Sequence, residues 1–358
     1  MYGRYLLLMI GAASGVAGYQ AATAADNAIS GAMLYAEHCA ACHGVNGKPD
    51  PLNPALDSFD VLPVDFSDAL FNSREPGRDW RLVVGHGGAA LGLSDNMPAF
   101  GAVLSGDDID AVVSYAKSLA DTRDYPPGDL NFPLPVRTKK AFPEDEVVWK
   151  LRYSGQDGDD EVRNVLELEK RFGTRWQGIA ELAHVSKGGR KRIDEAELGF
   201  KYTLDWDLDR GYILSAGLVG AIPIDDRDDA DKIIPMLMGA KRLSDNFVYQ
   251  GSTRAKIPVF EDISGGEAEF ASVVHWLPTV WPRGVFPGLE VTATVPFEED
   301  GDRVPWALLP QTRIGLTRGG HVALNLGAEI PLSDQSWGWR GHMCVIWDLA
   351  DGSLFNWW

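Results

Sequence analysis

Cysteine is scarce in this chain of 358 residues, which contains only three. A disulfide framework, the device that commonly stabilises small exported domains, is therefore excluded as the basis of the fold. Cys39 and Cys42 are separated by two residues, whereas Cys344 lies near the other end of the chain. We interpret Cys344 as a small buried apolar residue, and the closely spaced pair as a site.

Basic residues and long apolar runs are also scarce. The chain has 33 Lys and Arg against 51 Asp and Glu, a formal net charge of −18. A nucleic-acid partner is therefore not expected, because binding to phosphate needs a basic face. Beyond the N-terminal residues no stretch reaches 18 consecutive apolar residues, so no helical membrane span is predicted. The length predicts two domains.

The first residues have the pattern of a secretory signal peptide. Arg4 is followed by an apolar stretch, and Ala22-Thr23-Ala24 supplies a small-residue cleavage site. We predict a signal peptide over 1–24, cleaved before Ala25, and hence an exported protein. The alternative is an uncleaved membrane anchor.

The residue after the second cysteine decides how the motif at 39–43 is interpreted. A zinc site would need a second ligand pair, and no other C-x-x-C occurs. A thioredoxin-type dithiol would follow a strand, whereas residues 26–39 have helical spacing. His43 directly follows Cys42, and C-x-x-C-H is the attachment pattern of a c-type haem. The motif therefore predicts one covalent haem c bonded to Cys39 and Cys42, with His43 as an iron ligand.

A haem domain needs a second axial ligand, and Met97 is the candidate. It lies in a loop indicated by the Ser, Asp, Asn and Pro residues of 94–98, ahead of a helix predicted over 106–120 with Ser105 as its N-cap. A methionine opposite a histidine raises the reduction potential of the iron. His86, in a glycine-rich loop, is the alternative ligand, and Met97 would then be an ordinary core residue.

With these motifs the sequence resembles the class I cytochrome c family. The resemblance rests on Cys39 to Gly44, Gly47-Lys48, Met97 to Phe100 and the helix near 106–120, and it covers roughly residues 27–122. It implies a small all-α fold wrapped around one haem, over 25–122, that transfers single electrons. An apolar shell should exclude water from the haem. Candidates for this shell are Phe66, Leu82, Val83 and Phe100.

Proline punctuates the next segment. Five prolines fall between residues 121 and 146, which have little periodicity. Proline disfavours helix and favours extended backbone. We predict a domain linker over 123–145, either a plain spacer or a segment packed on one domain through Phe132, Leu134 and Phe142.

From residue 146 to 358 the hydrophobic period changes from 3.6 to 2. The stretch 195–208 alternates without interruption, and 147–154, 289–297 and 321–331 show the same pattern. Clusters of Gly, Asp and Ser separate these runs and indicate turns. The count of runs predicts an all-β antiparallel domain of about 10–12 strands.

Three features favour a transmembrane β-barrel over a soluble β-sandwich. The strands are long enough to cross a bilayer at a tilt, the chain closes on an aromatic residue, Trp358, and aromatic residues gather near strand ends, as at membrane interfaces. The remaining histidines of this domain are scattered and interpreted as lumen or surface residues. The aromatic residues are Trp149, Tyr153, Trp176, Trp206, Tyr212, Trp276, Trp281, Trp306, Trp337, Trp339 and Trp347.

The plan of the whole chain resembles the cytochrome–porin fusions of iron-oxidising bacteria. This resemblance implies electron transfer between an outer or periplasmic donor and periplasmic electron-transfer proteins, with the barrel contacting outer-membrane lipid. Side chains largely fill a barrel of about twelve strands, so a cytochrome could not thread its lumen. With an even number of strands, the first and the last strand both have their free ends on the periplasmic side. The haem domain, which precedes the first strand, is therefore expected there as well. Two alternatives stay open: a soluble periplasmic cytochrome subunit whose β domain docks an oxidoreductase, and a transporter gated by the haem.

Overall fold

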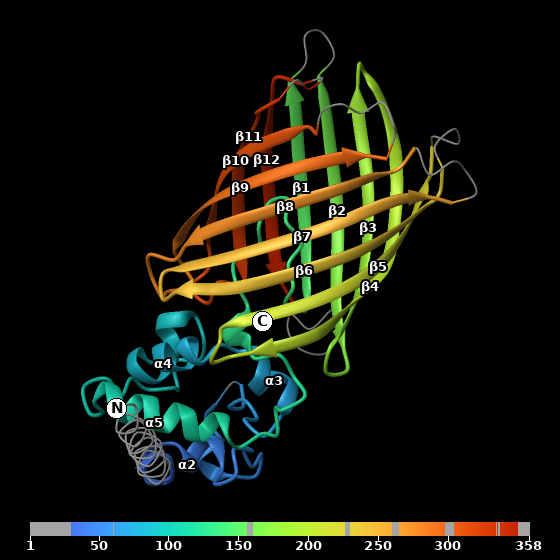
Figure 1. Cartoon of the computed structure of the whole chain (residues 1–358). Coiled ribbons are helices and arrows are strands. Elements are labelled where there is room, and N and C mark those ends of the chain that lie inside the picture. Colours follow the sequence, from blue (N-terminus) through green and yellow to red (C-terminus); the bar gives the residue numbers. More distant parts are fainter. Residues whose placement is uncertain are drawn as a thin grey trace, which may run out of the picture. The chain divides into compact units, whose positions relative to one another are not determined.

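The computed structural model describes residues 30–59, 61–155, 160–225, 230–259, 265–297, 304–333, 335 and 337–349. The predicted signal peptide at 1–24 and the terminal Trp358 lie outside these residues. The chain divides into two compact units, Met1–Thr122 and Arg123–Trp358, and Figure 1 shows a helical unit and a barrel. Within the described residues no helix is long and apolar enough to cross a membrane.

The first unit is built from short helices, as the sequence predicts. Residues 30–38 are helical. Two helices have their first turns fixed by side chains: Asp68 accepts from the amides of the turn that follows it, and Ser105 forms a capping box with Asp108. The other elements are α2 Ala40–His43, η1 Pro54–Leu56, α3 Ala69–Arg74, α4 Gly77–His86, η2 Gly88–Leu91 and α5 Gly106–Lys117.

The helix at 30–38 crosses α5 at close range. A Cβ on Gly31 would lie 2.3 Å from the carbonyl oxygen of Ala111, so only glycine permits this approach. The rings of Tyr35 and Tyr115 lie 5.2 Å apart, and Tyr35 is the most deeply buried side chain of the cluster that the two helices share. This contact forms the core of the first unit.

The second unit contains twelve strands after one 3-10 turn, η3 Gly128–Leu130. The strands are β1 Glu146–Gly155, β2 Glu161–Phe172, β3 Trp176–Lys187, β4 Arg190–Asp207, β5 Tyr212–Pro223, β6 Lys232–Ser244, β7 Phe247–Pro258, β8 Glu267–Trp276, β9 Val285–Pro296, β10 Trp306–Gly315, β11 Val322–Pro331 and β12 Trp339–Asp348.

These strands form one closed antiparallel barrel. Each strand pairs with its sequence neighbours, and β1 closes the barrel on β12, with Glu146 opposite Asp348 and Gly155 opposite Trp339 (Figure 1). Closure leaves no strand edge unpaired. The predicted all-β antiparallel barrel of about 10–12 strands is confirmed.

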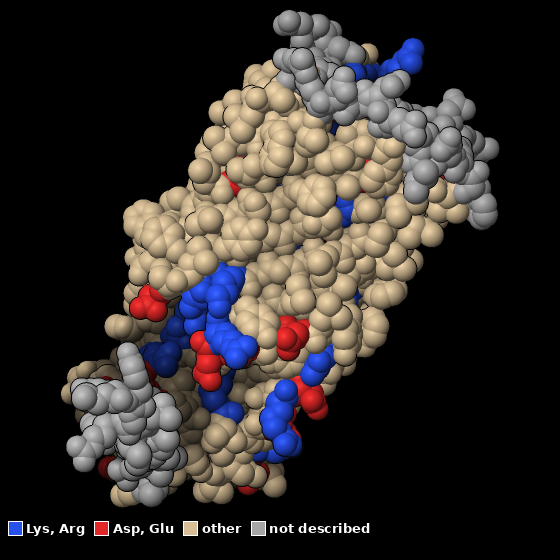
Figure 2. Space-filling view, in the orientation of Figure 1, with Lys and Arg blue, Asp and Glu red and all other residues tan. Residues whose placement is uncertain are grey.

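Alternation along the strands separates two surfaces of opposite character. On β4, Leu198 points outward and is 73 % exposed, whereas Lys201 points into the lumen and is 2 % exposed. Figure 2 shows the outer face of the strands as a broad surface with few charged side chains. The polar side chains lie inside, the reverse of a water-soluble barrel.

The uninterrupted alternation predicted over 195–208 is wrong at one position. A register shift between Thr203 and Asp205 places Trp206 opposite Ile213, which is 1 % exposed, and Trp206 packs against the interior cluster. A β-bulge adds one residue to a strand and so reverses the faces beyond it. Trp206 therefore does not join the outward-facing aromatic residues. Trp337, only 6 % exposed, is also absent from them.

Residues 128–145, predicted as part of a linker, lie inside the barrel. Leu130, Phe132, Ala141 and Phe142 are each at most 3 % exposed and pack in one cluster with lumen-facing residues of β3, β5, β6 and β7. This segment groups with the barrel in the division of the chain. We call residues 128–145 the plug.

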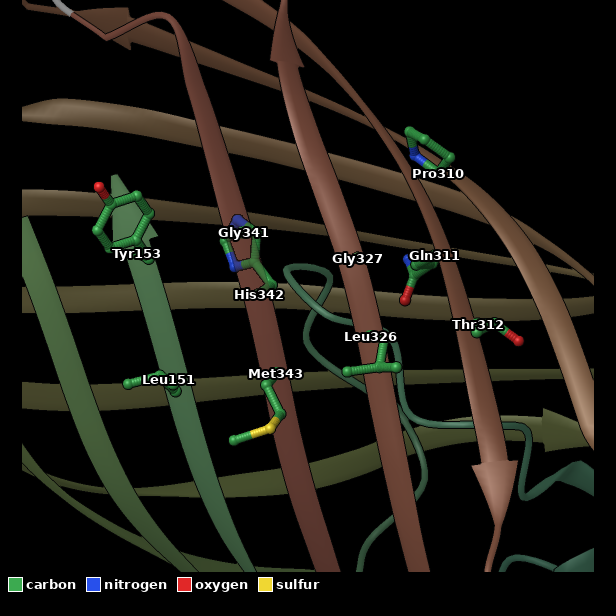
Figure 3. Close-up of a pocket in the computed structure, with 10 residues that line it drawn as sticks. All are labelled: Leu151, Tyr153, Pro310, Gln311, Thr312, Leu326, Gly327, Gly341, His342 and Met343. Carbon is green, nitrogen blue, oxygen red and sulfur yellow. The ribbon is translucent and has the colours of Figure 1, made fainter. Parts of the chain in front are cut away.

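The barrel wall carries a groove of about 560 Å³ across β1, β12, β11 and β10 (Figure 3). Pro310 lines it, and the pairing of β10 with β11 is interrupted between Leu308 and Gln311. Proline has no amide proton to donate to a neighbouring strand. In Figure 3 the loop of the plug is visible behind these strands.

Candidate functional site

The two cysteines and the histidine of the motif share one tight turn. The amide of Cys42 donates to the carbonyl of Cys39 at 3.1 Å, and the amide of His43 donates to the same carbonyl at 2.9 Å. The chain then reverses at Gly44, whose φ is +75° and whose Cβ would lie 2.1 Å from the carbonyl oxygen of Lys48. Only glycine adopts this backbone without strain. Within five residues the turn presents two thiols that can form thioether bonds and one imidazole that can ligate a metal.

His43 has a buried ring with an unused nitrogen. Phe66 stacks on the imidazole, with the ring centroids 4.4 Å apart and an interplanar angle of 14°. Burial lowers the pKa of His43 below its usual value, so the ring is neutral at pH 7. Among the described residues, no partner bonds its buried Nδ1. A neutral buried imidazole with spare bonding capacity suits a metal ligand.

The thiol of Cys39 has the character of an inert rather than a redox-active group. Burial, and then the nearby Cys42, raise the pKa of Cys39 to about 11. Redox-active C-x-x-C thiols have lowered pKa values instead. Cys39 packs against the buried cluster that contains Tyr35. The structure thus agrees with the sequence analysis, which argued against a thioredoxin-type dithiol.

Met97 is held against the C-terminal end of α4. Its carbonyl accepts from the amide of Gly88 at 3.0 Å, and the amide of Phe100 donates to Val84 at 2.9 Å. Met97 is half-buried, whereas His86 is exposed. The loop is thereby fixed to a helix at both ends.

The structure brings the motif turn and the Met97 loop together. The rings of His38, just before Cys39, and Phe100, just after the Met97 loop, have centroids 5.6 Å apart. Trp80 and Val84 of α4 pack against the same cluster as Cys39. The motif turn and the Met97 loop are more than fifty positions apart in the sequence, and α4 contacts both of them.

Of the predicted shell residues, Phe66 contacts His43 directly and Leu82 is buried. Trp80 was missed: its ring lies 4.7 Å from that of Phe66. Its spacing of four from Val84 on one helix was the available signal. The contact between His38 and Phe100 was missed as well, because the position of His38 beside the motif does not indicate which distant residue it contacts.

Residues 26–115 match the family model described as cytochrome C oxidase, cbb3-type, subunit III. The N-terminal unit is a cytochrome c domain. This family implies a haem c and an electron-transfer role. The residues of the motif turn fit such a group, since the described structure supplies two thiols, a buried imidazole nitrogen without a partner and a nearby thioether loop.

The chain is similar to solved structures of a porin and of an outer membrane channel. The KdgM porin is 11 % identical, with 57 % of this chain and 100 % of that chain covered and a TM-score of 0.41. The COG4313 outer membrane channel from Pseudomonas putida F1 is 12 % identical, with 60 % and 99 % covered and a TM-score of 0.46. No curated protein sequence matches the chain significantly. The protein thus joins a cytochrome c domain to a twelve-strand barrel.

Proposed function

We propose that the protein is a single-electron carrier with one covalent haem c, anchored in the outer membrane by its barrel. Cys39 and Cys42 would hold the haem through thioether bonds, and His43 and Met97 would ligate its iron. The observation that carries the proposal is the imidazole of His43, which directly follows Cys42, stacks on Phe66 and has a buried Nδ1. His86 is the weaker candidate ligand because it is exposed.

The cytochrome c domain surrounds this turn with apolar and aromatic side chains. When bound, haem c supplies reversible one-electron chemistry at iron. Phe66 covers one face of His43, and Trp80 lies against Phe66 at 4.7 Å. Exclusion of water by such a shell, together with a thioether ligand, raises the reduction potential. These contacts favour a carrier of relatively high potential.

The outward face of the barrel supports placement in a membrane. Large apolar side chains on it are widely exposed, including Leu166 at 53 %, Leu237 at 51 % and Leu289 at 51 %. In water this surface would carry a large cost in free energy, at about 25 cal/mol for each Å² of apolar area. Lipid removes that cost, and bacterial barrels that span the outer membrane have this alternation.

Aromatic side chains mark two levels on the barrel. Trp176, Trp276 and Trp347 lie at the end where β1 begins, and Trp306 and Trp339 lie at the opposite end. Each is between 38 % and 50 % exposed. Amphipathic rings of this kind favour the headgroup regions, so the two levels correspond to the two interfaces of a bilayer.

The lengths of the connections support an orientation. At the end where β1 begins, the five connections between strands have 3, 4, 2, 8 and 6 residues, whereas at the other end the six connections have 5, 2, 8, 8, 9 and 7 residues and are longer on average. Outer-membrane barrels have short periplasmic turns and longer extracellular loops. The plug enters at the short-turn end, where the guanidinium of Arg242 donates to the carbonyl of Asp129 at 2.6 Å. The cytochrome c domain would therefore lie in the periplasm and exchange electrons with periplasmic electron-transfer proteins.

Spectra of isolated outer membranes test this proposal. We expect a reduced-minus-oxidised haem spectrum and a pyridine haemochrome in the outer-membrane fraction, with a polypeptide whose gel migration changes on heating. The Cys42→Ala variant should lose covalent haem stain but keep the heat-dependent migration. Haem found only in the soluble periplasmic fraction would remove the anchor from the proposal, and wild-type protein without haemochrome would end the carrier role.

A further inference from the structure

The plug has two parts of different chemistry. Its base is apolar: Leu130, Phe132 and Phe142 pack against lumen-facing Ile213, Ile234 and other members of the interior cluster. Its tip, residues 136–139, contacts the wall through polar atoms. The base therefore anchors the segment by apolar burial, whereas the tip depends on hydrogen bonds and ion pairs.

One wall carboxylate binds the tip. Glu290 on β9 is 0 % exposed and accepts from the amide of Arg137 at 3.1 Å and from the amide and hydroxyl of Thr138 at 2.5 Å each. Gln311 on β10 donates to the same carboxylate at 2.7 Å and accepts from the amide of Val136 at 3.0 Å. Figure 3 shows Gln311 on its strand, with the loop of the plug behind the wall. The carboxylate of Glu290 thus accepts hydrogen bonds from the tip and from the wall at the same time.

The charged side chains of the tip reach the wall on several strands. The ammonium of Lys139 lies 2.8 Å from Glu167 on β2 and 2.5 Å from Glu181 on β3. The guanidinium of Arg137 lies 3.7 Å from Glu269 on β8 and 3.9 Å from Glu329 on β11. Water can replace each of these bonds when the tip moves, so the cost of release is far smaller than for an apolar tip.

The wall beyond the tip, toward the long-loop end, is lined by charged pairs. They are Arg152–Glu161, Arg163–Glu195, Arg254–Glu197, Lys256–Glu267 and Arg340–Glu329. Interiors of this polarity suit a hydrated passage. Eight-strand barrels are just filled by their own side chains, whereas twelve strands enclose a wider space. The expectation that wall side chains alone would largely fill this lumen is therefore not met. In this barrel the plug occupies that extra space.

We propose that the plug seals a hydrophilic passage, and that the barrel conducts small water-soluble solutes when the tip leaves Glu290. This adds solute passage to electron transfer and does not depend on haem ligation. The base of the plug stays in its apolar cluster while the tip moves, so the barrel keeps its fold in both states.

Conductance of the full-length protein in planar lipid bilayers, with KCl as the probe, tests the proposal. Wild type should be closed for most of the time. Glu290→Ala removes the acceptor of four hydrogen bonds and should raise the open fraction at least about tenfold, the factor that one bond to a charged group is worth. Arg163→Ala is the matched control, because Arg163 pairs with Asp194 and Glu195 on the wall. It should behave as wild type.

Cys344 supplies a second measurement. It is 3 % exposed and belongs to a lumen-side cluster with Val148, Ala323 and Ile346, against which Leu134 of the plug packs. Labelling by a hydrophilic maleimide should be slow in wild type and at least about tenfold faster in Glu290→Ala, while Arg163→Ala leaves it slow.

Three outcomes would overturn the proposal. A wild-type barrel that conducts steadily is not sealed. A Glu290→Ala barrel that keeps heat-dependent migration but gains neither conductance nor labelling has a fixed plug. If Glu290→Ala fails to fold, Thr138→Ala and Lys139→Met, which change the tip alone, replace it. Folded barrels of both variants with unchanged conductance would contradict the proposal equally.

Discussion

The ring of Phe66 stacks on the imidazole of His43, with centroids 4.4 Å apart and planes inclined by 14°. This contact fixes the orientation of the imidazole and covers one side of it. A histidine that ligates a metal is oriented by its neighbours, and these neighbours tune the metal as strongly as the ligand does. Phe66 is therefore a positioning residue of the haem site.

We expect Phe66→Ala to lower the reduction potential of the haem and the stability of the cytochrome c domain. Water reaches the imidazole, and the lost packing costs about 1–3 kcal/mol of the free energy of unfolding. Redox titration and thermal unfolding of the haem-loaded protein measure the two effects. Phe71→Ala is the control, since the ring of Phe71 contacts Trp80, with centroids 6.0 Å apart, whereas the ring that stacks on His43 is that of Phe66. An equal drop of potential in both variants would remove the special role of Phe66.

The two candidate axial ligands can be separated by substitution. Met97→Ala should change the spectrum of the oxidised protein and lower the reduction potential, because a thioether ligand opposite histidine raises it. His86→Ala should leave both unchanged, since this side chain is exposed. The measurement is a redox titration followed by visible absorption. The reverse result, with His86→Ala active on the spectrum, would transfer the ligand role to His86.

The thiol of Cys39 should react slowly in protein prepared without haem. Burial raises its pKa to about 11, against about 8.5 for a free cysteine, so at pH 8 alkylation by iodoacetamide should be about two orders of magnitude slower. The folded state holds this proton more tightly than the unfolded state does. The thiol's contribution to stability is therefore full below pH 9 and is lost as the pH rises through 11.

A Cys42→Ser/Cys344→Ser variant isolates Cys39 for this measurement. Its alkylation rate should rise with a midpoint near pH 11 when folded, and near the free-cysteine value in urea. Burial is the largest cause of the shift, so the loss of Cys42 should alter the midpoint only slightly. A folded midpoint at the free-cysteine value would show that the turn is open to solvent.

The barrel was predictable from its sequence because one face of every strand is turned outward and is largely apolar, whereas the other face is turned into the lumen. Successive side chains of a strand point to opposite faces, so the two environments impose a period of 2 that is visible in the sequence. The motif turn was predictable because Cys39, Cys42 and His43 are neighbours in the chain. Trp206 was not, because the bulge after Thr203 depends on pairing with β5 and leaves no mark in the alternation.

The plug was predicted only in part: packing on one domain through Phe132, Leu134 and Phe142 was one of two alternatives, but its place inside the barrel was not predicted, for a related reason. Its backbone bonds go to side chains on strands that follow later in the chain, at separations such as 33 residues for Glu144 and Gln177 and 152 residues for Thr138 and Glu290. A segment that pairs with no strand has no period of its own, and its prolines suggested a spacer. The buried carboxylate within β9 was the available signal, since a buried charge needs partners. The sequence does not say where those partners lie.

Lys201 offers a direct measure of how firmly the plug is held. Its ammonium is buried and donates to the carbonyls of Lys140 at 3.0 Å and Phe142 at 2.8 Å. Lys201→Met leaves both carbonyls without this donor and should cost about 1–3 kcal/mol of barrel stability. The urea or heat midpoint of the gel-migration change measures it. Lys191→Met, on the exposed part of the same strand, should be neutral; equal midpoints for the two variants would mean that the plug contributes nothing to stability.

The lipid-facing wall can be tested with one charge. Leu198 is 73 % exposed on the outer face of β4, and Leu198→Arg should destabilise the barrel in lipid vesicles by about 2–4 kcal/mol if it lies near the bilayer midplane, and less near an interface. Leu52→Arg, at a position of the cytochrome c domain that is 87 % exposed, places the same charge in water and should cost nothing measurable. Both leucines are exposed, so exposure alone predicts equal tolerance, and only a membrane around the barrel separates them. Equal stability of the two variants in vesicles would mean that β4 does not face lipid.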